Sequence, residues 1–220
     1  MSSSATDTSS RLRITEIFYS LQGESGSAGM PTVFIRLTGC PLRCGYCDTA
    51  YAFQGGEWMD VKDIVSSVSA YRTRYVTVTG GEPLAQRNCH ELLRQLCDAG
   101  YEVSLETSGA LDLSGVDSRV VRVMDLKTPS SGECERNLYT NIGCLSGRDQ
   151  VKFGIAARED DEWSARQVEH YHLADRCEVL FSHSYGQQDA AMLAGWILED
   201  HLPVRFQVQL HKILWGDEPG

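Results

Sequence analysis

Three cysteines in one short stretch have the residue types and spacing best suited to chemistry in this sequence. Cys40, Cys44 and Cys47 follow a C-x3-C-x2-C pattern that can turn three sulfur atoms toward one concave loop. Thiolates are soft ligands that select iron–sulfur clusters, zinc or Cu(I). A four-iron–four-sulfur cluster is usually held by four cysteines, whereas here the next residues are the hard, polar pair Asp48 and Thr49. Three protein ligands leave one iron open to bind and activate another molecule, so the loop predicts an active site.

A structural zinc site is the alternative for the same cysteines, with a distant fourth ligand such as Cys89 or His90. The neighbouring residues favour a cluster, because a zinc knuckle needs neither an Asp-Thr pair nor the Gly-Gly-Glu-Pro loop at residues 80–83. The remaining five cysteines are scattered: Cys89, Cys97, Cys134, Cys144 and Cys177. Cys97 and Cys177 have apolar neighbours and are best explained as buried small hydrophobic side chains.

Composition excludes several classes of function. The 220 residues include 30 acidic and 20 basic side chains, for a net charge of −10. Binding to nucleic acid or to an anionic membrane surface needs clustered Lys and Arg, and the sequence has no such cluster. The apolar runs are too short to span a bilayer. The polar residues at the start lack the features of a signal peptide, so we expect a cytoplasmic protein with a disordered tail over residues 1–12 and a single domain over 13–220.

Strands alternate with helices along the chain, which indicates βαβ units and a mainly parallel sheet. The expected strands are 14–19, 32–37, 75–78, 102–106, 119–126, 150–155, 178–182 and 203–210, and the expected helices are 61–68, 88–99, 161–172 and 187–198. Polar and glycine-bearing segments recur just after strands, where active sites of parallel barrels lie. The chain is short for eight full units, and connections such as 109–119 are poor helix formers. We therefore expect an α/β fold with an incomplete parallel β/α barrel.

The cysteine spacing, with Tyr46 just before the third cysteine, resembles the radical S-adenosylmethionine (SAM) superfamily. A wider series of motifs resembles the 7-carboxy-7-deazaguanine synthase family, from the pathway to queuosine and other 7-deazapurines. These motifs lie, in order, at residues 21–24 (LQGE), 36–40 (RLTGC), 47–49 (CDT), 79–83 (TGGEP) and 106–109 (ETSG). The resemblance is dense from Ile14 to Lys127 and thinner afterwards. It implies a partial radical SAM barrel.

The resemblance also implies the reaction, which is the conversion of 6-carboxy-5,6,7,8-tetrahydropterin to 7-carboxy-7-deazaguanine with loss of ammonia. The expected cofactors are a 4Fe-4S cluster on three cysteines, SAM on the open iron, and Mg²⁺ held by Thr49. Residues in the cysteine loop and at later strand ends are expected to contact SAM: Tyr46, Asp48, Gly80, Gly81, Glu82, Ser108, Asp125 and Lys127. Glycines allow close backbone approach to a ligand, and Glu82 can accept a hydrogen bond from the SAM ammonium.

An acidic pterin needs a cation for its carboxylate and hydrogen-bond acceptors for its amino-pyrimidinone edge. The planar guanidinium of Arg36 suits the carboxylate. The full set of expected substrate contacts is Leu21, Gln22, Gly23, Glu24, Arg36, Thr79, Gln209 and His211. The end of the chain departs from the family pattern, because Gln209-Leu210-His211-Lys212-Ile213 is followed by seven more residues. A role for the C-terminal carboxylate is therefore in doubt.

The resemblance further implies a homodimer and an electron donor of the reduced flavodoxin or ferredoxin type. One alternative keeps the cluster but changes the substrate: an activating enzyme that makes a glycyl radical on a partner protein can use the same cysteine spacing. That alternative has no need of residues 21–24 or of Arg36.

Overall fold

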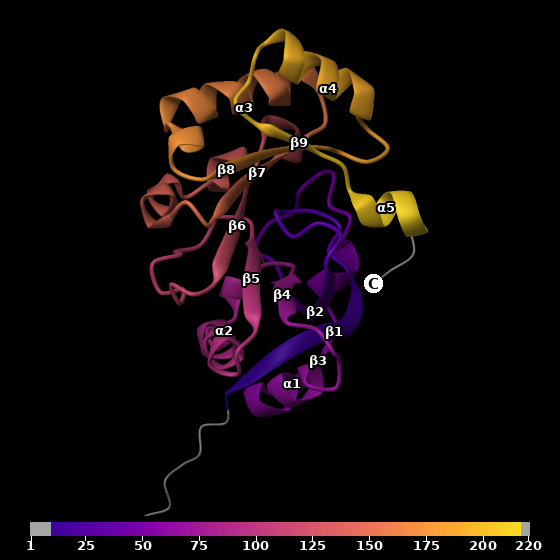
Figure 1. Ribbon diagram of the computed structural model, residues 1–220, viewed down its shortest axis with the longest axis vertical. Helices are drawn as coiled ribbons and strands as arrows, with labels where there is room; N and C mark the ends of the chain where they lie inside the picture. Colours follow the sequence, from indigo (N-terminus) through magenta and orange to yellow (C-terminus); the bar gives the residue numbers. More distant parts are fainter. Residues whose placement is uncertain (1–9, 217–220) are drawn as a thin grey trace, which may run out of the picture.

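The computed structural model describes residues 10–216, and one nine-stranded sheet organises this part of the chain (Figure 1). The spatial order is β3-β1-β2-β4-β5-β6-β7-β8-β9. From β2 to β9 each neighbouring pair is parallel, while β1 runs antiparallel to both β2 and β3. The strands are β1 (Arg11–Leu21), β2 (Pro31–Leu37), β3 (Glu57–Asp60), β4 (Tyr75–Gly80), β5 (Glu102–Thr107), β6 (Val121–Leu126), β7 (Gln150–Ile155), β8 (Glu178–His183) and β9 (Arg205–Gln207). The sheet is open, as expected for an incomplete barrel.

Helices cover the outer face of the sheet, with α1 and α2 near one end and α3 and α4 near the other (Figure 1). The α-helices are α1 (Val61–Val68), α2 (Cys89–Asp98), α3 (Arg158–His170), α4 (Ala190–Glu199) and α5 (Leu210–Trp215). Short 3-10 turns occur at η1 (Ala50–Phe53), η2 (Pro83–Ala85), η3 (Pro129–Ser131), η4 (Cys134–Arg136), η5 (Tyr139–Cys144) and η6 (Leu173–Asp175). Within residues 10–216, no helix is both long enough and apolar enough to cross a membrane.

Apolar and polar side chains alternate along the strands, so the sheet has an apolar outer face and a polar inner face. Ile35, Val78 and Phe153 are fully buried in the single hydrophobic core that the strands form with α1 to α4. Successive side chains of a strand point to opposite faces, so the residues between these apolar positions point inward. The cross-strand register places one polar residue from each parallel strand on this same inner face, with an offset of two residues between β5 and β6 and between β7 and β8: Arg36, Thr79, Glu106, Asp125, Lys152, Ser182 and Gln207.

The expected alternation of strands and helices is confirmed, with three differences. The chain enters β1 at Arg11, and Leu12 is fully buried, so ordered structure begins before the predicted domain start at residue 13; residues 1–9 of the predicted tail lie outside the described residues. Strand β3 was not predicted and pairs with the first four residues of β1. The strand predicted over 203–210 was wrong in extent, because β9 ends at Gln207 and α5 begins at Leu210.

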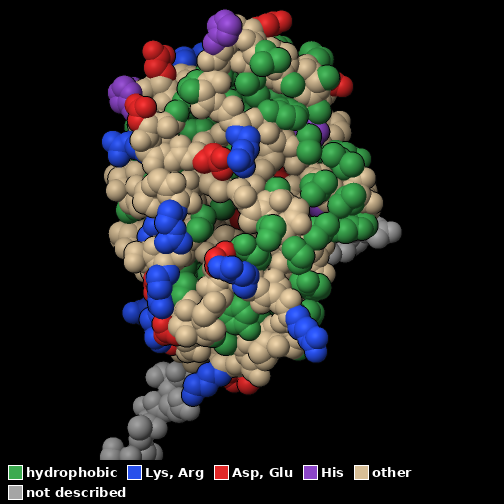
Figure 2. All heavy atoms as spheres, in the orientation of Figure 1, with side chains coloured by type: hydrophobic (Ala, Val, Ile, Leu, Met, Phe, Trp, Pro, Cys, Tyr) green, Lys and Arg blue, Asp and Glu red, His purple; other side chains and the backbone are tan. Residues whose placement is uncertain are grey.

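Helix α5 leaves large apolar side chains uncovered. Ile213, Leu214 and Trp215 are all exposed. On the face drawn in Figure 2, hydrophobic side chains gather toward the side that carries α5 in Figure 1, while Lys and Arg are spread along the opposite side.

Candidate active site

The cysteine loop follows β2 at the carboxyl end of the parallel strands, and two other loops hold it in place. The amide of Gly45 donates to the carbonyl of Ser131 at 2.9 Å, and the amide of Arg43 donates to the Glu133 carboxylate at 2.5 Å. The Tyr46 hydroxyl lies 3.0 Å from the hydroxyl of Thr128. The segment after β6 therefore braces the cysteine loop, although it contains only 3-10 turns.

The three thiols are half-buried, and their surroundings suit a metal cluster. Burial is the main cause that raises the pKa of all three; with smaller contributions from Asp125 and the neighbouring cysteines, the pKa of Cys44 rises to about 11. The Lys127 ammonium opposes this rise. Such thiols become thiolates when a metal replaces the proton. Within residues 10–216, no three His, Cys, Asp or Glu side chains converge tightly enough to hold a single metal ion.

The Gly80-Gly81 pair lies against the backbone that leads into the cysteine loop. A Cβ on Gly80 would lie 2.2 Å from the carbonyl oxygen of Leu37, and a Cβ on Gly81 would lie 2.3 Å from that of Gly39. Gly80 also has a φ of 149°. The amide of Gly81 donates to the Leu37 carbonyl at 3.1 Å. Glycine is therefore needed here for the close contact between two protein segments, before any ligand is considered.

Glu82 is fully buried, and donors of the protein surround its carboxylate. Oε1 accepts from the amide of Leu84 at 3.0 Å, Oε2 accepts from the amide of Ser108 at 2.7 Å, and the Thr107 hydroxyl lies 2.9 Å from both oxygens. Its side chain thus fixes the start of η2 and the end of β5.

A chain of alternating charges crosses the inner face of the sheet. Glu24 pairs with Lys152 at 2.9 Å, Lys152 with Asp125 at 3.3 Å, and Asp125 with Lys127 at 3.2 Å. Burial opposes the charged form of Lys127, but the Asp125 carboxylate raises the pKa of Lys127 above its ordinary value. The Oδ1 atom of Asp125 is buried and has no hydrogen-bond partner within the described residues. A buried acceptor of this kind marks a place for a ligand donor.

Gln22 begins a second polar network beside this chain. Its Nε2 donates to Glu106 at 3.1 Å and to Thr77 at 3.2 Å, and the Thr79 hydroxyl donates to the other oxygen of Glu106 at 2.8 Å. The amide of Glu24 lies 3.3 Å from Oε1 of Gln22. The expected substrate residues Gln22 and Thr79 are therefore joined through Glu106, at the end of β1 where Leu21 ends the strand.

Arg36 lies on the inner face, between aromatic rings and an acid. Its Nε donates to Glu16 at 2.6 Å, and its guanidinium carbon lies 5.7 Å from the ring centres of both Phe18 and Tyr51. Tyr51 also donates to Glu16 at 2.8 Å. Neither terminal nitrogen of Arg36 has a hydrogen bond within residues 10–216, so both remain available for a bidentate carboxylate.

The C-terminal segment closes over the loop that follows β1. Leu210 donates its amide to the Gly23 carbonyl at 2.9 Å, and the His211 ring packs so closely on Gly23 that a Cβ there would lie 2.0 Å from Nδ1. Gln209 reaches Oδ2 of Asp48 at 3.3 Å, and the Thr49 hydroxyl donates to Oδ1 of Asp48 at 2.7 Å. Gly23, Asp48, Thr49, Gln209 and His211 are thus brought together.

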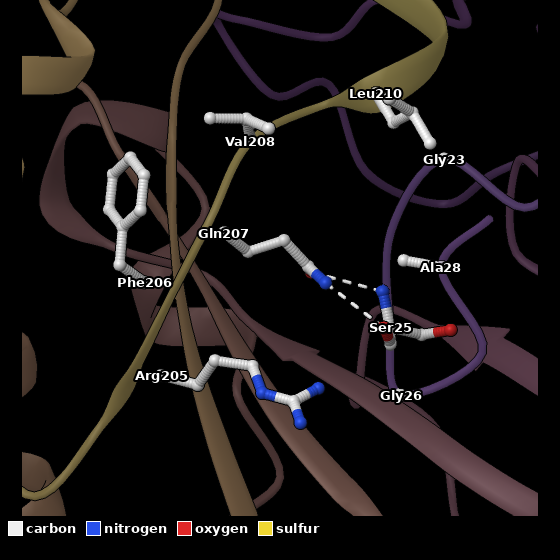
Figure 3. Close-up of a pocket in the computed structure, with 9 residues that line it drawn as sticks. All are labelled: Gly23, Ser25, Gly26, Ala28, Arg205, Phe206, Gln207, Val208 and Leu210. Atoms are coloured by element: carbon white, nitrogen blue, oxygen red, sulfur yellow. Dashed lines mark hydrogen bonds between the residues drawn. The ribbon is translucent and has the colours of Figure 1, made fainter.

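A cavity of about 330 Å³ lies between residues 23–28 and the segment from β9 to α5 (Figure 3). Gln207 points across it and forms two hydrogen bonds of 3.0 Å with the backbone of Ser25. The adjoining amide of Gly26 donates to Gln150 at 2.9 Å. Two glutamines from strands therefore fix the loop that carries Glu24.

Sequence reasoning missed four residues that this geometry brings to the site: Glu106, Glu133, Lys152 and Ser182. Glu106 lies in the quoted ETSG motif but had no assigned role. Lys152 had a recognisable pattern, since it alternates with the apolar Val151 and Phe153 in a predicted strand. For Glu133 and Ser182 we find no comparable local pattern.

Comparison with known proteins agrees with this geometry. The model of the radical SAM superfamily matches residues 34–125, which run from β2 through the cysteine loop to Asp125. Fold and site thus define a radical SAM enzyme, a class whose members use a 4Fe-4S cluster and SAM.

Curated relatives make the assignment narrower. A protein of Chlorobaculum tepidum named 7-carboxy-7-deazaguanine synthase is 42% identical over 214 residues, covering 96% of this chain and 97% of the relative. A relative of the same name from Methanospirillum hungatei is 43% identical, covering 94% and 86%. The chain belongs to the 7-carboxy-7-deazaguanine synthase family. The crystal structure of QueE from Escherichia coli superposes with a TM-score of 0.75 at 21% identity, covering 91% of this chain and 95% of that one, which shows the shared fold.

Proposed function

We propose that this chain is a lyase that converts 6-carboxy-5,6,7,8-tetrahydropterin to 7-carboxy-7-deazaguanine and ammonia, a step toward queuosine. Its membership of the family supports this reaction. The observation that carries it is the arrangement of the inner face, where Arg36 and the acceptors Glu24 and Glu106 lie in one polar row beside the cysteine loop. An acidic heterocycle with an N–H edge needs this combination of a guanidinium and carboxylates.

Cys40, Cys44 and Cys47 hold the cluster, because they are three soft donors on one half-buried loop. When bound together, the cluster and SAM supply a radical that removes a hydrogen atom from the substrate. The Gly80-Gly81 backbone and the strand ends that carry Ser108, Asp125 and Lys127 would hold SAM. Glu82 acts on this site by fixing Ser108, and Tyr46 by holding the cysteine loop against β6.

The substrate carboxylate pairs with the terminal nitrogens of Arg36, whose Nε is already fixed by Glu16. The carboxylate of Glu24 and the Gln22–Glu106–Thr79 network accept the N–H groups of the pterin edge. Backbone groups of Leu21 and Gly23 contribute to the same edge. Gln209 and His211 close the site from the side of α5, which excludes water from the charged groups.

Thr49 holds Mg²⁺ beside the substrate, and Asp48 orients the Thr49 hydroxyl. Magnesium prefers hard oxygen ligands and keeps several waters, so one hydroxyl with substrate oxygens makes a suitable shell. The electron comes from a reduced flavodoxin or ferredoxin-type protein. The enzyme is a cytoplasmic homodimer that binds neither nucleic acid nor membrane; sedimentation of the purified protein tests its oligomeric state.

The experiment is an anaerobic assay of reconstituted protein with SAM, a one-electron reductant, Mg²⁺ and the carboxytetrahydropterin. We expect a deazapurine product and ammonia in equal amounts. The Cys44→Ala variant is the negative control, because it lacks one of the three cluster ligands. SAM cleavage by the wild-type protein without a deazapurine product would leave the superfamily assignment standing and reject this substrate.

A further inference from the structure

Two side chains from distant strands hold the carboxylate of Glu24. Lys152 of β7 donates to Oε2 at 2.9 Å, and Ser182 of β8 donates to Oε1 at 2.9 Å. The Glu24 side chain is only 14% exposed, so these bonds are shielded from water. A carboxylate has about four lone-pair positions. One donor on each oxygen leaves one further position on each oxygen for a ligand.

Lys152 remains an ammonium while it makes this contact. Burial alone would favour its neutral form, but the Glu24 and Asp125 carboxylates outweigh burial and raise the pKa of Lys152 well above its ordinary value. Such a lysine is a poor proton donor at neutral pH. It acts as a fixed positive charge beside the Glu24 carboxylate.

The other groups around Glu24 add negative charge or none. Glu106 is a second carboxylate, joined to the amide of Glu24 through the side chain of Gln22. Asp125 adds a third negative charge on the far side of Lys152. His211 approaches from α5, and burial lowers the pKa of His211 below its ordinary value. Lys152 is therefore the cation that directly contacts the Glu24 carboxylate.

The backbone that carries Glu24 is fixed independently. Gln207 forms two hydrogen bonds with the backbone of Ser25 (Figure 3). Gln150 accepts a hydrogen bond from the amide of Gly26. Loss of Lys152 or Ser182 is therefore expected to change the hydrogen bonds and orientation of one carboxylate without releasing its loop.

We propose that Lys152 and Ser182 are positioning residues that hold Glu24 as an ionised double acceptor for two N–H groups of the substrate. This inference rests on the proposed function, because it names the residues that select the amino-pyrimidinone edge of the pterin. The proposal also predicts which ring systems the site rejects. A heterocycle that presents hydrogen-bond acceptors in place of these N–H groups should bind more weakly, because the Glu24 carboxylate cannot donate a hydrogen bond to it.

The test compares kcat and KM for the carboxytetrahydropterin in Lys152→Met, Lys152→Arg and Ser182→Ala. Lys152→Met is expected to raise KM ten- to one-hundredfold, the range for losing a hydrogen bond to a charged group. Lys152→Arg keeps the charge and a donor and should restore KM in part. Ser182→Ala removes a neutral donor and should raise KM less than Lys152→Met. Lys62→Met, on the exposed face of α1, is the matched control for loss of a lysine charge and should leave KM unchanged.

A double-mutant cycle separates positioning from a general structural role. If Lys152 acts through Glu24, Lys152→Met should raise KM less than threefold in a Glu24→Gln background, although it raises KM at least tenfold in the wild type. Equal effects in the two backgrounds, or a KM for Lys152→Arg as high as that for Lys152→Met, would overturn the proposal. If its melting temperature shows that Lys152→Met does not fold, the double-mutant cycle of Ser182→Ala with Glu24→Gln tests the proposal instead. Failure of the wild type to form the deazapurine would reject the proposed function, whereas turnover by the wild type with an additive cycle would reject this inference alone.

Discussion

Replacing Glu82 by glutamine is expected to destabilise the protein strongly, although the two side chains have nearly the same shape. The fully buried carboxylate accepts from two backbone amides, those of Leu84 at 3.0 Å and Ser108 at 2.7 Å, one on each oxygen. The amide group of glutamine must replace one of these oxygens. Whichever way it turns, one backbone N–H then faces another donor and loses its partner.

The magnitude follows from these contacts. One buried donor without a partner costs about 1–3 kcal/mol, and the remaining bonds lose the extra strength that a charged acceptor gives, about 1 kcal/mol each. The expected loss for Glu82→Gln is therefore about 2–5 kcal/mol of the free energy of unfolding, a large share of the roughly 5–15 kcal/mol of a typical domain. Because Glu82 fixes Ser108 beside the cysteine loop, the iron content after reconstitution should also fall.

Urea denaturation of the anaerobically reconstituted wild type and variant measures this loss. Glu57→Gln, an exposed glutamate of β3, is the control and should change stability by less than about 0.5 kcal/mol. A Glu82→Gln variant as stable as this control would refute the assignment of Glu82 as a buried acceptor that organises the strand ends.

Four further outcomes are expected. Cys44→Ala should remove the cluster's absorption, whereas Cys177→Ala should keep it; loss of the cluster in Cys177→Ala would contradict the three-cysteine assignment. Arg36→Ala should weaken substrate binding by about 2–5 kcal/mol, with partial rescue by Arg36→Lys, while uncoupled SAM cleavage persists; an unchanged KM would remove the case for a carboxylate partner. Thr49→Ala should reduce the stimulation of turnover by Mg²⁺, and an intact magnesium response would exclude Thr49 as a ligand. Burial raises the pKa of Asp161 from 3.8 to about 6, so the folded protein loses stability as pH rises from about 4 to above 6 and this carboxyl ionises. Asp161→Asn should therefore stabilise the protein more at pH 7.5 than at pH 4, by up to about 3 kcal/mol. Equal melting-temperature shifts at the two pH values would contradict this.

Local patterns were sufficient to predict most of the sheet. Val33, Ile35 and Leu37 are apolar at every second position, and β2 includes all three. The cysteine loop and the Gly80-Gly81 turn could be placed because each directly follows such a strand. The end of the chain could not, because the apolar residues of 203–210 suit a strand, whereas contacts with the Gly23 loop end β9 early and begin α5.

The pairing of charged residues could not be predicted from the sequence. Glu24 meets Lys152 and Ser182 only because β1, β7 and β8 contribute to one inner face, and these partners lie 128 and 158 residues away along the chain. The protein donors to Glu82 were hidden for a similar reason, because the Ser108 amide at the end of β5 lies 26 residues away along the chain.

The mass of the product tests the central claim most directly. In the anaerobic reaction of the wild type, mass spectrometry should detect a product that differs from 6-carboxy-5,6,7,8-tetrahydropterin by the loss of one ammonia molecule. The conversion to 7-carboxy-7-deazaguanine is redox-neutral, so no further hydrogen should be lost. The account would be contradicted by a product that keeps all the nitrogen atoms of the substrate, or by unchanged substrate in the presence of an intact cluster, SAM and Mg²⁺.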